Sequence, residues 1–208
     1  MRLRNVKNKE EIMNNSQYLV KDYFANKGMW NKLFNNNNPI FIEIGMGKGQ
    51  FIINSALNFP DINFIGIEKY DSVIAKALQK VPDNVENLLM IRADALDIDK
   101  IFDKEVSKIY LNFSDPWPKN RHHLRRLSSK VFLDKYESVF DNVKDIEMRT
   151  DNKDLYTYSL VSFSKHGYTL DEISLNLHHD EMPLITTEYE DKFSSKNMPI
   201  YFVRCLKK

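Results

Sequence analysis

Cysteine is nearly absent from this sequence, and long apolar runs are absent altogether. The single cysteine, Cys205, has no partner for an internal disulfide, and it stands in an apolar stretch that favours a structural role. No apolar run approaches the ~20 residues that span a bilayer, and the first residues, Met1 to Arg4, lack the apolar core of a signal peptide. We therefore expect a cytoplasmic protein with no membrane partner.

A clear excess of charge of one sign is also lacking. The chain has 30 Lys and Arg against 29 Asp and Glu, which gives a formal net charge of +1. A strongly basic domain would indicate a nucleic-acid partner, so any such partner here must be held by a local patch. The 208 residues, 42% of them hydrophobic and 28% charged, match ordinary globular usage and suit one domain.

The chain changes character at Pro39. Residues 1–38 are polar and rich in asparagine, and they predict a partly helical N-terminal extension. From 39 to 208, short β-prone apolar runs alternate with segments of helical period, as in a parallel sheet with crossover helices on both faces. The predicted strands are 39–44, 63–68, 87–92, 108–113, 145–150, 168–176 and 199–206. The last follows a loop rather than a helix, so we expect it to run antiparallel in a seven-stranded, Rossmann-like α/β sheet.

Helical spacing is clearest in four segments. The residues that repeat are Phe51, Ile52, Ser55 and Ala56 in the first, Val73, Ile74, Ala77, Leu78 and Val81 in the second, Val131, Leu133, Tyr136 and Phe140 in the third, and Leu155, Tyr158, Val161 and Ser162 in the fourth. Pro82 ends the second segment, and Gly167 is a plausible C-cap for the fourth.

A glycine loop follows the first predicted strand. Gly45, Gly47 and Gly49 let the backbone turn sharply from strand to helix and let a ligand lie against it. The spacing differs from the dinucleotide fingerprint, and Glu43 before it would repel a pyrophosphate. The same carboxylate would attract the positively charged amino-acid end of S-adenosyl-L-methionine (SAM). The alternative is a tight structural turn with a solvated glutamate.

Acids also end the next two strands. Glu68 closes the second strand, where nucleoside-binding folds hold the ribose hydroxyls, and Asp94 follows the third, where it could accept a hydrogen bond from an adenine amino group. Each alone is also typical of a helix N-cap or a surface charge. Three acids at successive strand ends beside a glycine loop favour a cofactor site.

The segment after the fourth strand combines rigidity with positive charge. Pro116 and Pro118 bracket Trp117, which stiffens the loop and presents an aromatic face. The basic residues that follow are Lys119, Arg121, His122, His123, Arg125 and Arg126. Such a patch suits phosphates and stacked bases, although a charge run is also typical of a solvated face. His122 and His123 lack partners at metal-ligand spacing, so we expect no metal.

This segment resembles the signature of bacterial tRNA (guanine-N7)-methyltransferases, with Asp115-Pro-Trp-Pro-Lys119, then Arg-His-His and paired arginines. The resemblance extends over residues 39–208, through the motif that starts at Glu43, Gly66-Ile-Glu68, Thr150-Asp151 and Thr187-Glu-Tyr-Glu190. Asn120, where a second basic residue is expected, is a small departure.

The resemblance implies a SAM-dependent class I methyltransferase that acts on a guanine in the tRNA variable loop. It implies that Glu43, Glu68, Asp94 and Asp115 line the cofactor pocket, with Asp115 also catalytic. It further implies that residues 121–126 bind RNA. The residues implied in substrate contact are Lys119, Asp151, Thr187 and Glu190.

The chemistry of guanine N7 agrees with the lack of an obvious catalytic dyad. N7 carries an exposed lone pair and needs no base, so the enzyme must chiefly align base and methyl donor, and a carboxylate such as Asp115 can stabilise the positive charge that develops. One alternative is an amino-group methyltransferase of adenine or cytosine, although Trp117 replaces the second proline of the Asn/Asp-Pro-Pro-aromatic loop. Another is a non-catalytic RNA-binding protein, which the three acids disfavour. Monomer and homodimer both stay open.

Overall fold

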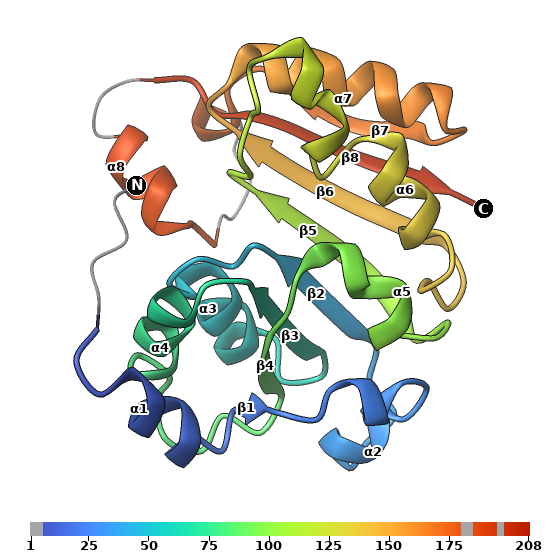
Figure 1. Cartoon of the computed structure of the whole chain (residues 1–208). Helices are drawn as coiled ribbons and strands as arrows, with labels where there is room; N and C mark the ends of the chain where they lie inside the picture. The colour runs from blue at the N-terminus through green and yellow to red at the C-terminus, as the bar shows by residue number, and fades with distance from the viewer. Residues whose placement is uncertain (1–5, 180–184, 195–197) are drawn as a thin grey trace.

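The computed structural model of the chain describes residues 6–179, 185–194 and 198–208, and one mixed β-sheet runs through it (Figure 1). Its strand order is β1-β4-β3-β2-β5-β6-β8-β7. The strands are β1 (Leu19–Val20), β2 (Ile40–Ile44), β3 (Asn63–Glu68), β4 (Leu88–Arg92), β5 (Val106–Asn112), β6 (Lys144–Thr150), β7 (Thr169–Ser174) and β8 (Tyr201–Lys207). All seven predicted strands are present.

Strand directions place the candidate ligand site. Strands β1 to β6 of the sheet pair in parallel, whereas β8 is antiparallel to both of its neighbours, β6 and β7. The antiparallel last strand is therefore confirmed. Strand β2 lies between β3 and β5, so the chain order reverses there, and ligands of open α/β sheets bind at the carboxyl ends of the strands beside such a switch point.

The expected count of seven strands was one too low, because the N-terminal segment adds β1 at the edge of the sheet. Leu19 pairs with Met90 of β4, and the Met90 amide donates to the Tyr18 carbonyl at 2.7 Å. A strand of two residues is too short to show the alternation by which a strand is recognised in a sequence.

Helices cover both faces of the sheet, in the arrangement shown in Figure 1. They are α1 (Lys9–Asn15), α2 (Trp30–Phe34), α3 (Gln50–Asn58), α4 (Asp71–Leu78), α5 (Ile98–Ile101), α6 (Lys130–Tyr136), α7 (Lys153–Lys165) and α8 (Glu188–Ser194). One apolar cluster joins α3 and α4 to the sheet, and the other joins α2, α5, α6 and α7 to its opposite face.

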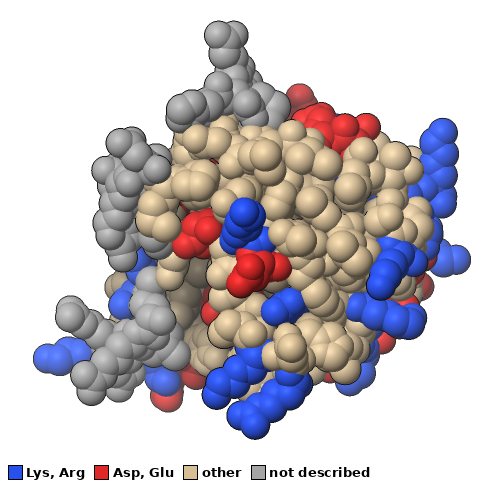
Figure 2. Space-filling view, turned by 90° about the horizontal axis from the view of Figure 1, so that it is seen from above, with Lys and Arg blue, Asp and Glu red and all other residues tan. Residues whose placement is uncertain are grey.

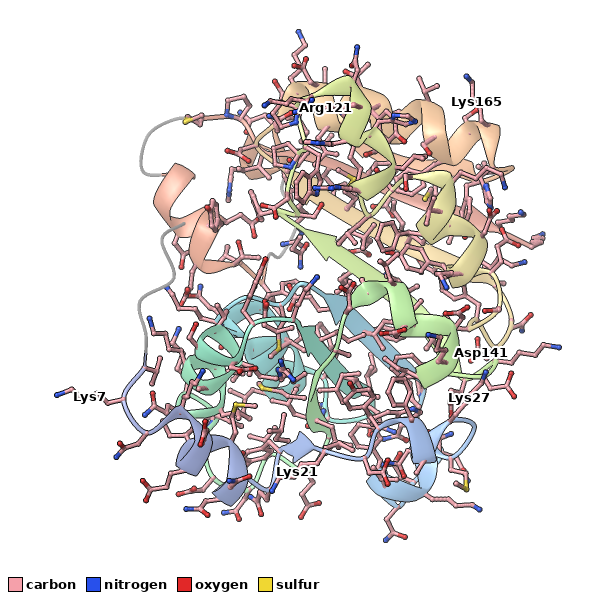
Figure 3. All side chains as sticks on the ribbon, in the orientation of Figure 1. Lys7, Lys21, Lys27, Arg121, Asp141 and Lys165 are labelled. Atoms are coloured by element: carbon pink, nitrogen blue, oxygen red, sulfur yellow. The ribbon has the colours of Figure 1, made fainter. Side chains whose placement is uncertain are left out.

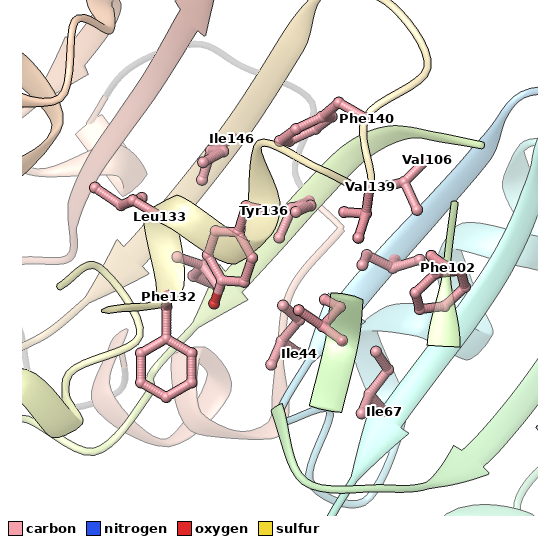
Figure 4. Close-up of a cluster of buried hydrophobic side chains, with 14 of the residues drawn as sticks. Ile44, Ile67, Phe102, Val106, Phe132, Leu133, Tyr136, Val139, Phe140 and Ile146 are labelled. Atoms are coloured by element: carbon pink, nitrogen blue, oxygen red, sulfur yellow. The ribbon is translucent and has the colours of Figure 1, made fainter. Parts of the chain in front are cut away.

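Period-2 alternation in the strands divides the core between these two clusters. In β2, Ile40, Ile42 and Ile44 belong to the α5–α7 side, whereas Phe41 packs on the α3–α4 side. Figure 4 shows part of the cluster on the α5–α7 side, in which Tyr136 of α6 lies among the isoleucines of neighbouring strands. At roughly 25 cal/mol per Å² of apolar area, such burial is the main stabilising contribution to the fold.

The first predicted helical face is confirmed, but the third and fourth are partly wrong. Phe140 lies beyond the end of α6 at Tyr136, and α7 buries Leu155, Tyr156, Ser159 and Phe163, with Val161 exposed. Phe51, Ile52, Ser55 and Ala56 of α3 are all buried. Helix α4 ends at Leu78, one turn earlier than the repeat up to Val81 indicated. The last helix of this group, α7, ends at Lys165, and Gly167 just beyond it has a φ of +85° that an L side chain rarely adopts.

The N-terminal segment packs against the sheet. Trp30 of α2 is fully buried, and its indole Nε1 donates to the Ile101 carbonyl at 3.0 Å. The Glu105 carboxylate accepts from the backbone amides of Gly28 and Trp30 at 2.8 and 3.2 Å. Residues before Pro39 thus contribute to the core, and a domain boundary at 38/39 stays a prediction.

Candidate active site

A cavity of about 790 Å³ opens at the carboxyl edge of the sheet, beside the switch point at β2. This volume lies within the usual range of ligand pockets, roughly 300–1,000 Å³. Its walls come from the loops after β2, β3, β4 and β5, from the start of α6 and from the start of α8. The predicted site residues that line it are Glu43, Gly45, Gly47, Gly49, Glu68, Asp94, Asp115, Arg125 and Thr187.

The glycine loop forms the floor of one end of the cavity. All three glycines have positive φ, at +78° for Gly45, +59° for Gly47 and +80° for Gly49, which an L residue adopts only with strain. A Cβ on Gly49 would approach Ala77 of α4 to 3.0 Å. A Cβ on Gly45 or Gly47 would meet nothing within 4 Å, so these two glycines leave open space in the cavity wall.

Glu43 lies beneath this loop, almost completely buried with 2% of its surface exposed. Burial raises the pKa of its carboxyl group to about 7, against the opposing effects of the Asn112 hydrogen bond and the Arg149 charge. Oε1 accepts from Asn112 Nδ2 at 2.9 Å, whereas Oε2 is buried without a partner among the described residues. A solvated glutamate is therefore the wrong interpretation of this position.

Asn112 is a site residue that the sequence analysis missed. It ends β5, lines the cavity, and has a buried Oδ1 with no partner among the residues that the structure describes. A polar residue at the end of an apolar strand was the available signal. Two buried acceptor atoms, Glu43 Oε2 and Asn112 Oδ1, thus belong to the cavity wall and lack donors.

Glu68 closes β3 and is 7% exposed. Its carboxylate accepts from the Tyr70 amide at 2.9 Å and from the Gly47 amide at 3.2 Å, which ties the ends of β2 and β3 together. Burial raises the pKa of Glu68, and the nearby charge of Asp115 adds to this effect. The surface-charge alternative is excluded for Glu68.

Asp94 has both a cavity position and a capping role. It is the N-cap of a short 3₁₀ helix (Ala95–Asp97) and accepts from the Leu96 amide at 3.0 Å. It also pairs with Lys69 at 2.6 Å. Burial would raise the pKa of Asp94, but the hydrogen bonds from Lys69 and Leu96 outweigh it and lower the pKa. The N-cap alternative is therefore correct for Asp94, and it coexists with a place in the cavity wall.

The loop after β5 forms the opposite end of the cavity. Asp115 is exposed and lines the cavity, and the residues two positions before and after it, Phe113 and Trp117, have positive φ of 50° and 43°. Such conformations are strained in non-glycine residues and gather at functional sites. The Trp117 ring contacts the Arg125 guanidinium, 5.0 Å from its centroid, and is perpendicular to the His122 ring, with the two ring centroids 5.7 Å apart.

The basic segment beyond this loop is a 3₁₀ helix (Asn120–Arg125). Lys119, Arg121 and His123 are exposed, and Figure 3 shows Arg121 at the outer surface of the molecule. Basic and acidic side chains are interspersed on the face that Figure 2 shows, as expected for a net charge of +1. Arg126 differs from its neighbours, because only 8% of its surface is exposed.

Helix α8 begins with a capping box. The Thr187 hydroxyl accepts from the Glu190 amide at 3.0 Å, and the Glu190 carboxylate accepts from the Thr187 amide at 2.9 Å. Arg149 at the end of β6 donates to the Ile185 carbonyl at 2.7 Å and to the fully buried Glu190 carboxylate at 3.3 Å. Thr187 lines the cavity, whereas Glu190 does not line it and stabilises the start of α8 through the capping box. The Thr-x-x-Glu spacing signalled the box, but nothing in the sequence signalled Arg149.

The start of α8 also contacts both ends of the cavity. Glu188 forms ion pairs with Lys48 of the glycine loop, at 2.7 Å, and with Lys80. The neighbouring Tyr189 stacks on Phe113 of the loop after β5, with ring centroids 5.7 Å apart. Helix α8 therefore lies across the cavity, from the glycine loop to the strained loop.

Asp151 follows β6 at the same carboxyl edge and is half-buried. An aspartate at this position, just before α7, could also cap that helix. That role belongs instead to Asn152, whose side chain accepts from the Leu155 amide at 2.8 Å. Among the residues that the structure describes, no group of three His, Cys, Asp or Glu side chains could hold a metal ion, and no helix is long and apolar enough to cross a membrane.

Comparisons with known proteins agree with this geometry. A family model described as "Putative methyltransferase" matches residues 37–203. A tRNA (guanine-N(7)-)-methyltransferase of Oceanobacillus iheyensis is 48% identical over 200 residues, which cover 94% of this chain and 92% of the relative. The enzyme of the same name from Lysinibacillus sphaericus is 49% identical over 207 residues, 97% of this chain and 95% of the relative.

Solved structures share the fold at low sequence identity. The 16S rRNA methyltransferase KamB matches with a TM-score of 0.64 at 12% identity and covers 86% of this chain and 92% of its own. A 16S rRNA (adenine(1408)-N(1))-methyltransferase from Catenulisporales acidiphilia matches with a TM-score of 0.63 at 11% identity, over 89% and 93% of the two chains. These likenesses confirm the Rossmann-like class I methyltransferase fold.

Proposed function

The chain belongs to the tRNA (guanine-N7)-methyltransferase family, and we propose from this that it transfers a methyl group from SAM to N7 of a guanine in the variable loop of tRNA. One observation carries the proposal. A single cavity joins the acidic strand ends of a nucleoside site to the strained Asp115–Trp117 loop and its basic flank.

The residues present fit SAM as the methyl donor. Within the part of the chain that the structure describes, Glu43 Oε2 and Asn112 Oδ1 are buried acceptors without donors, and the ammonium group of SAM would supply them. Glu68 holds a carboxylate where ribose hydroxyls would bind, and Asp94 one where an adenine amino group would bind. The space left by Gly45 and Gly47 would let the nucleoside lie against the backbone.

When bound, SAM supplies an electrophilic methyl group on a positively charged sulfur. The work of the chain is then to hold guanine N7 in line with that methyl group, since alignment alone can account for ~7–11 kcal/mol of a barrier. Asp115 at the cavity wall places a negative charge where the purine ring becomes positive, and this stabilises the transition state. No general base is required, because N7 has a free lone pair.

Substrate contacts are assigned on the same grounds. Lys119, Arg121 and His123 are exposed basic residues beside the catalytic loop and suit RNA phosphates, whereas His122 and Arg125 contact the Trp117 ring. Asp151 has no capping role and is available to a donor edge of guanine. Thr187 reaches the cavity directly, whereas Glu190 serves it through the capping box.

One further assignment follows from the family. We place the protein in the cytoplasm, where a tRNA-modifying enzyme meets its substrate. Monomer and homodimer both stay open.

The decisive experiment is incubation of the protein with unmodified tRNA and isotope-labelled SAM, followed by mass spectrometry of the nucleosides. We expect labelled 7-methylguanosine within the variable loop. Labelled methyladenosine or methylcytidine would instead indicate an amino-group methyltransferase. RNA binding without any label transfer would indicate a non-catalytic RNA-binding protein.

A further inference from the structure

Two adjacent arginines at the end of the basic segment have opposite environments. Arg125 is exposed, lines the cavity and lies over Trp117. Arg126 is buried, with 8% of its surface exposed. A buried guanidinium cannot meet a phosphate on the RNA backbone without leaving its site, so the two side chains cannot share one role.

The guanidinium of Arg126 forms hydrogen bonds with the catalytic loop itself. Its Nε donates to the Pro116 carbonyl at 3.0 Å, and its Nη2 donates to the Trp117 carbonyl at 3.2 Å. The other side of the guanidinium faces Tyr158 of α7, 4.3 Å from the ring centroid. A planar guanidinium with donors in a fixed fork is suited to hold two successive carbonyls, and it stacks well on an aromatic ring.

Among the described residues, the backbone amides of the loop that Arg126 holds form a backbone hydrogen bond only at its start, where the Phe113 amide donates to the Arg149 carbonyl at 2.8 Å. Pro116 and Pro118 have no backbone N–H to donate, and Phe113 and Trp117 adopt left-handed backbone conformations. Such strained conformations persist only where the surrounding structure enforces them. Asp115 lies between these two residues, so the orientation of its carboxylate depends on the same enforcement.

Helix α7 supports the contact between Arg126 and the Pro116 and Trp117 carbonyls, which we call the Arg126 brace. Ser128 follows two residues after Arg126, and its hydroxyl shares a buried 2.6 Å hydrogen bond with the Ser159 hydroxyl of α7. Ser159 is next to Tyr158, so α7 fixes both the backbone near Arg126 and the ring against its guanidinium. Through Arg126, the loop is therefore held by α7, a 13-residue helix that packs on the core.

We propose that Arg126 is a positioning residue for methyl transfer, which holds the Pro116 and Trp117 carbonyls so that Asp115 and the Trp117 ring face the cavity, and that it does not bind RNA phosphate. The proposal rests on the proposed function for its kinetic part. Arg125, its neighbour in sequence, provides the matched contrast, because it is exposed and free to meet RNA.

The kinetic test compares Arg126→Ala with Arg125→Ala. In Arg126→Ala we expect kcat to fall about 100-fold, as for a misplaced catalytic group, while the KM for tRNA and its salt dependence stay within about twofold of the wild type. In Arg125→Ala we expect the KM to rise about tenfold and the salt slope to fall by about one. Arg126→Lys, which can hold one carbonyl, should regain part of the lost kcat.

A spectroscopic test does not depend on catalysis. The chain has two tryptophans, and Trp30 is fully buried, so quenching by acrylamide reports on Trp117. Loss of the brace should make Trp117 more accessible to the quencher in Arg126→Ala, with Arg126→Lys between this variant and the wild type. If the wild type methylates no tRNA, the proposed function fails, but the quenching measurement still tests whether Arg126 holds the loop around Trp117.

Two results would overturn the proposal. One is an Arg126→Ala protein with unchanged kcat and unchanged quenching. The other is an Arg126→Ala protein whose salt slope falls as in Arg125→Ala, since this would make Arg126 a phosphate ligand. Should Arg126→Ala not fold, Tyr158→Leu removes the ring that supports the guanidinium, and it should lower kcat and expose Trp117 in the same direction.

Discussion

Asn112 Nδ2 donates a hydrogen bond to Glu43 Oε1 at 2.9 Å, and each of the two side chains keeps one buried oxygen without a partner among the described residues. Two of the polar atoms of this pair are thus hydrogen-bonded to each other, and its two remaining oxygens are not satisfied by the described residues. Because an unpaired buried acceptor costs ~1–3 kcal/mol, a ligand that donates to both oxygens removes a penalty as well as forming contacts.

Glu43→Gln should stabilise the ligand-free protein at high pH. The folded-state pKa of about 7 lies above the ordinary value of 4.5, so folding takes up a proton between these values and the free energy of unfolding falls as pH rises through this window. Above pH 7 the wild type carries the full penalty, about 3 kcal/mol, which the neutral amide of the variant does not. Urea unfolding at pH 4.5 and pH 8 measures the difference in the free energy of unfolding between the wild type and the variant. An equal stability difference at the two pH values would contradict it.

The same substitution should remove a pH dependence from SAM binding. Between pH 5.5 and pH 7 the amino group of SAM stays protonated while Glu43 becomes charged, so the wild-type affinity should rise roughly tenfold. Calorimetry of Glu43→Gln should show weak binding with no such rise. A parallel rise in both proteins would place the ammonium away from Glu43.

Asp115→Asn should lower kcat by roughly 10²–10³-fold, because a preorganised charge at the developing cation is removed while the shape of the loop is kept. Binding of tRNA should change little, as measured by filter binding. Asp134→Asn provides the control, because Asp134 pairs with Lys130 on the exposed face of α6. Full activity in Asp115→Asn would remove this carboxylate from the mechanism.

Glu68→Gln should weaken SAM binding by ~10–100-fold, since a carboxylate that accepts from two ribose hydroxyls contributes ~1.5–3 kcal/mol. The folded state should persist, because an amide oxygen can still accept from the Tyr70 or Gly47 amide. Calorimetry with SAM gives the dissociation constant. An unchanged constant would locate the ribose elsewhere in the cavity.

Lys119→Ala and Arg121→Ala should each weaken tRNA binding and reduce its salt slope by about one, because each removes one phosphate contact. Affinity for tRNA is to be measured between about 50 and 200 mM salt. Lys165→Ala, at the end of α7, is the matched control for loss of one surface charge. Equal slopes in all proteins would show that the exposed cations are only a solvated surface.

Arg149→Met should destabilise the fold by ~3–5 kcal/mol, because it leaves the fully buried Glu190 carboxylate without its cation. For a domain of this size the melting temperature should fall by roughly 10 °C. Adding Glu190→Gln should recover much of the loss, since the amide can still accept from the Thr187 amide. Thermal unfolding of the single and double variants tests the energetic coupling between Arg149 and Glu190. If the destabilisation of the double variant equals the sum of the two single-variant values, the coupling is refuted.

Much of the part of the cavity that we propose binds SAM was predictable from sequence, because its signals are local. Short apolar β-prone runs predicted the strands, and Glu43, Glu68 and Asp94 lie at or just after the carboxyl ends of β2, β3 and β4. Parallel strands bring these ends to one edge of the sheet. The glycine spacing similarly required a turn with positive φ, and all three glycines have it. These features depend on residues close together in the chain.

For the segment that we propose binds RNA, the sequence indicated which residue types are present but not which side chains are buried. The sequence showed a proline-stiffened tryptophan and six basic residues after it, but a 3₁₀ segment has no long period from which inward and outward positions can be read. The contact with Tyr158 of α7 buries Arg126 and leaves Arg125 exposed. That contact joins residues more than 30 positions apart in the chain.

The sequence by itself determined the order and type of the main strands and helices and the acidic strand ends, since hydrophobic periodicity and turn chemistry are local properties. Tertiary structure alone decided that β1 joins the sheet, that Arg149 supports Glu190, and that one of two adjacent arginines turns inward. These outcomes depend on which distant surfaces meet when the chain packs, because burial is a property of the whole fold.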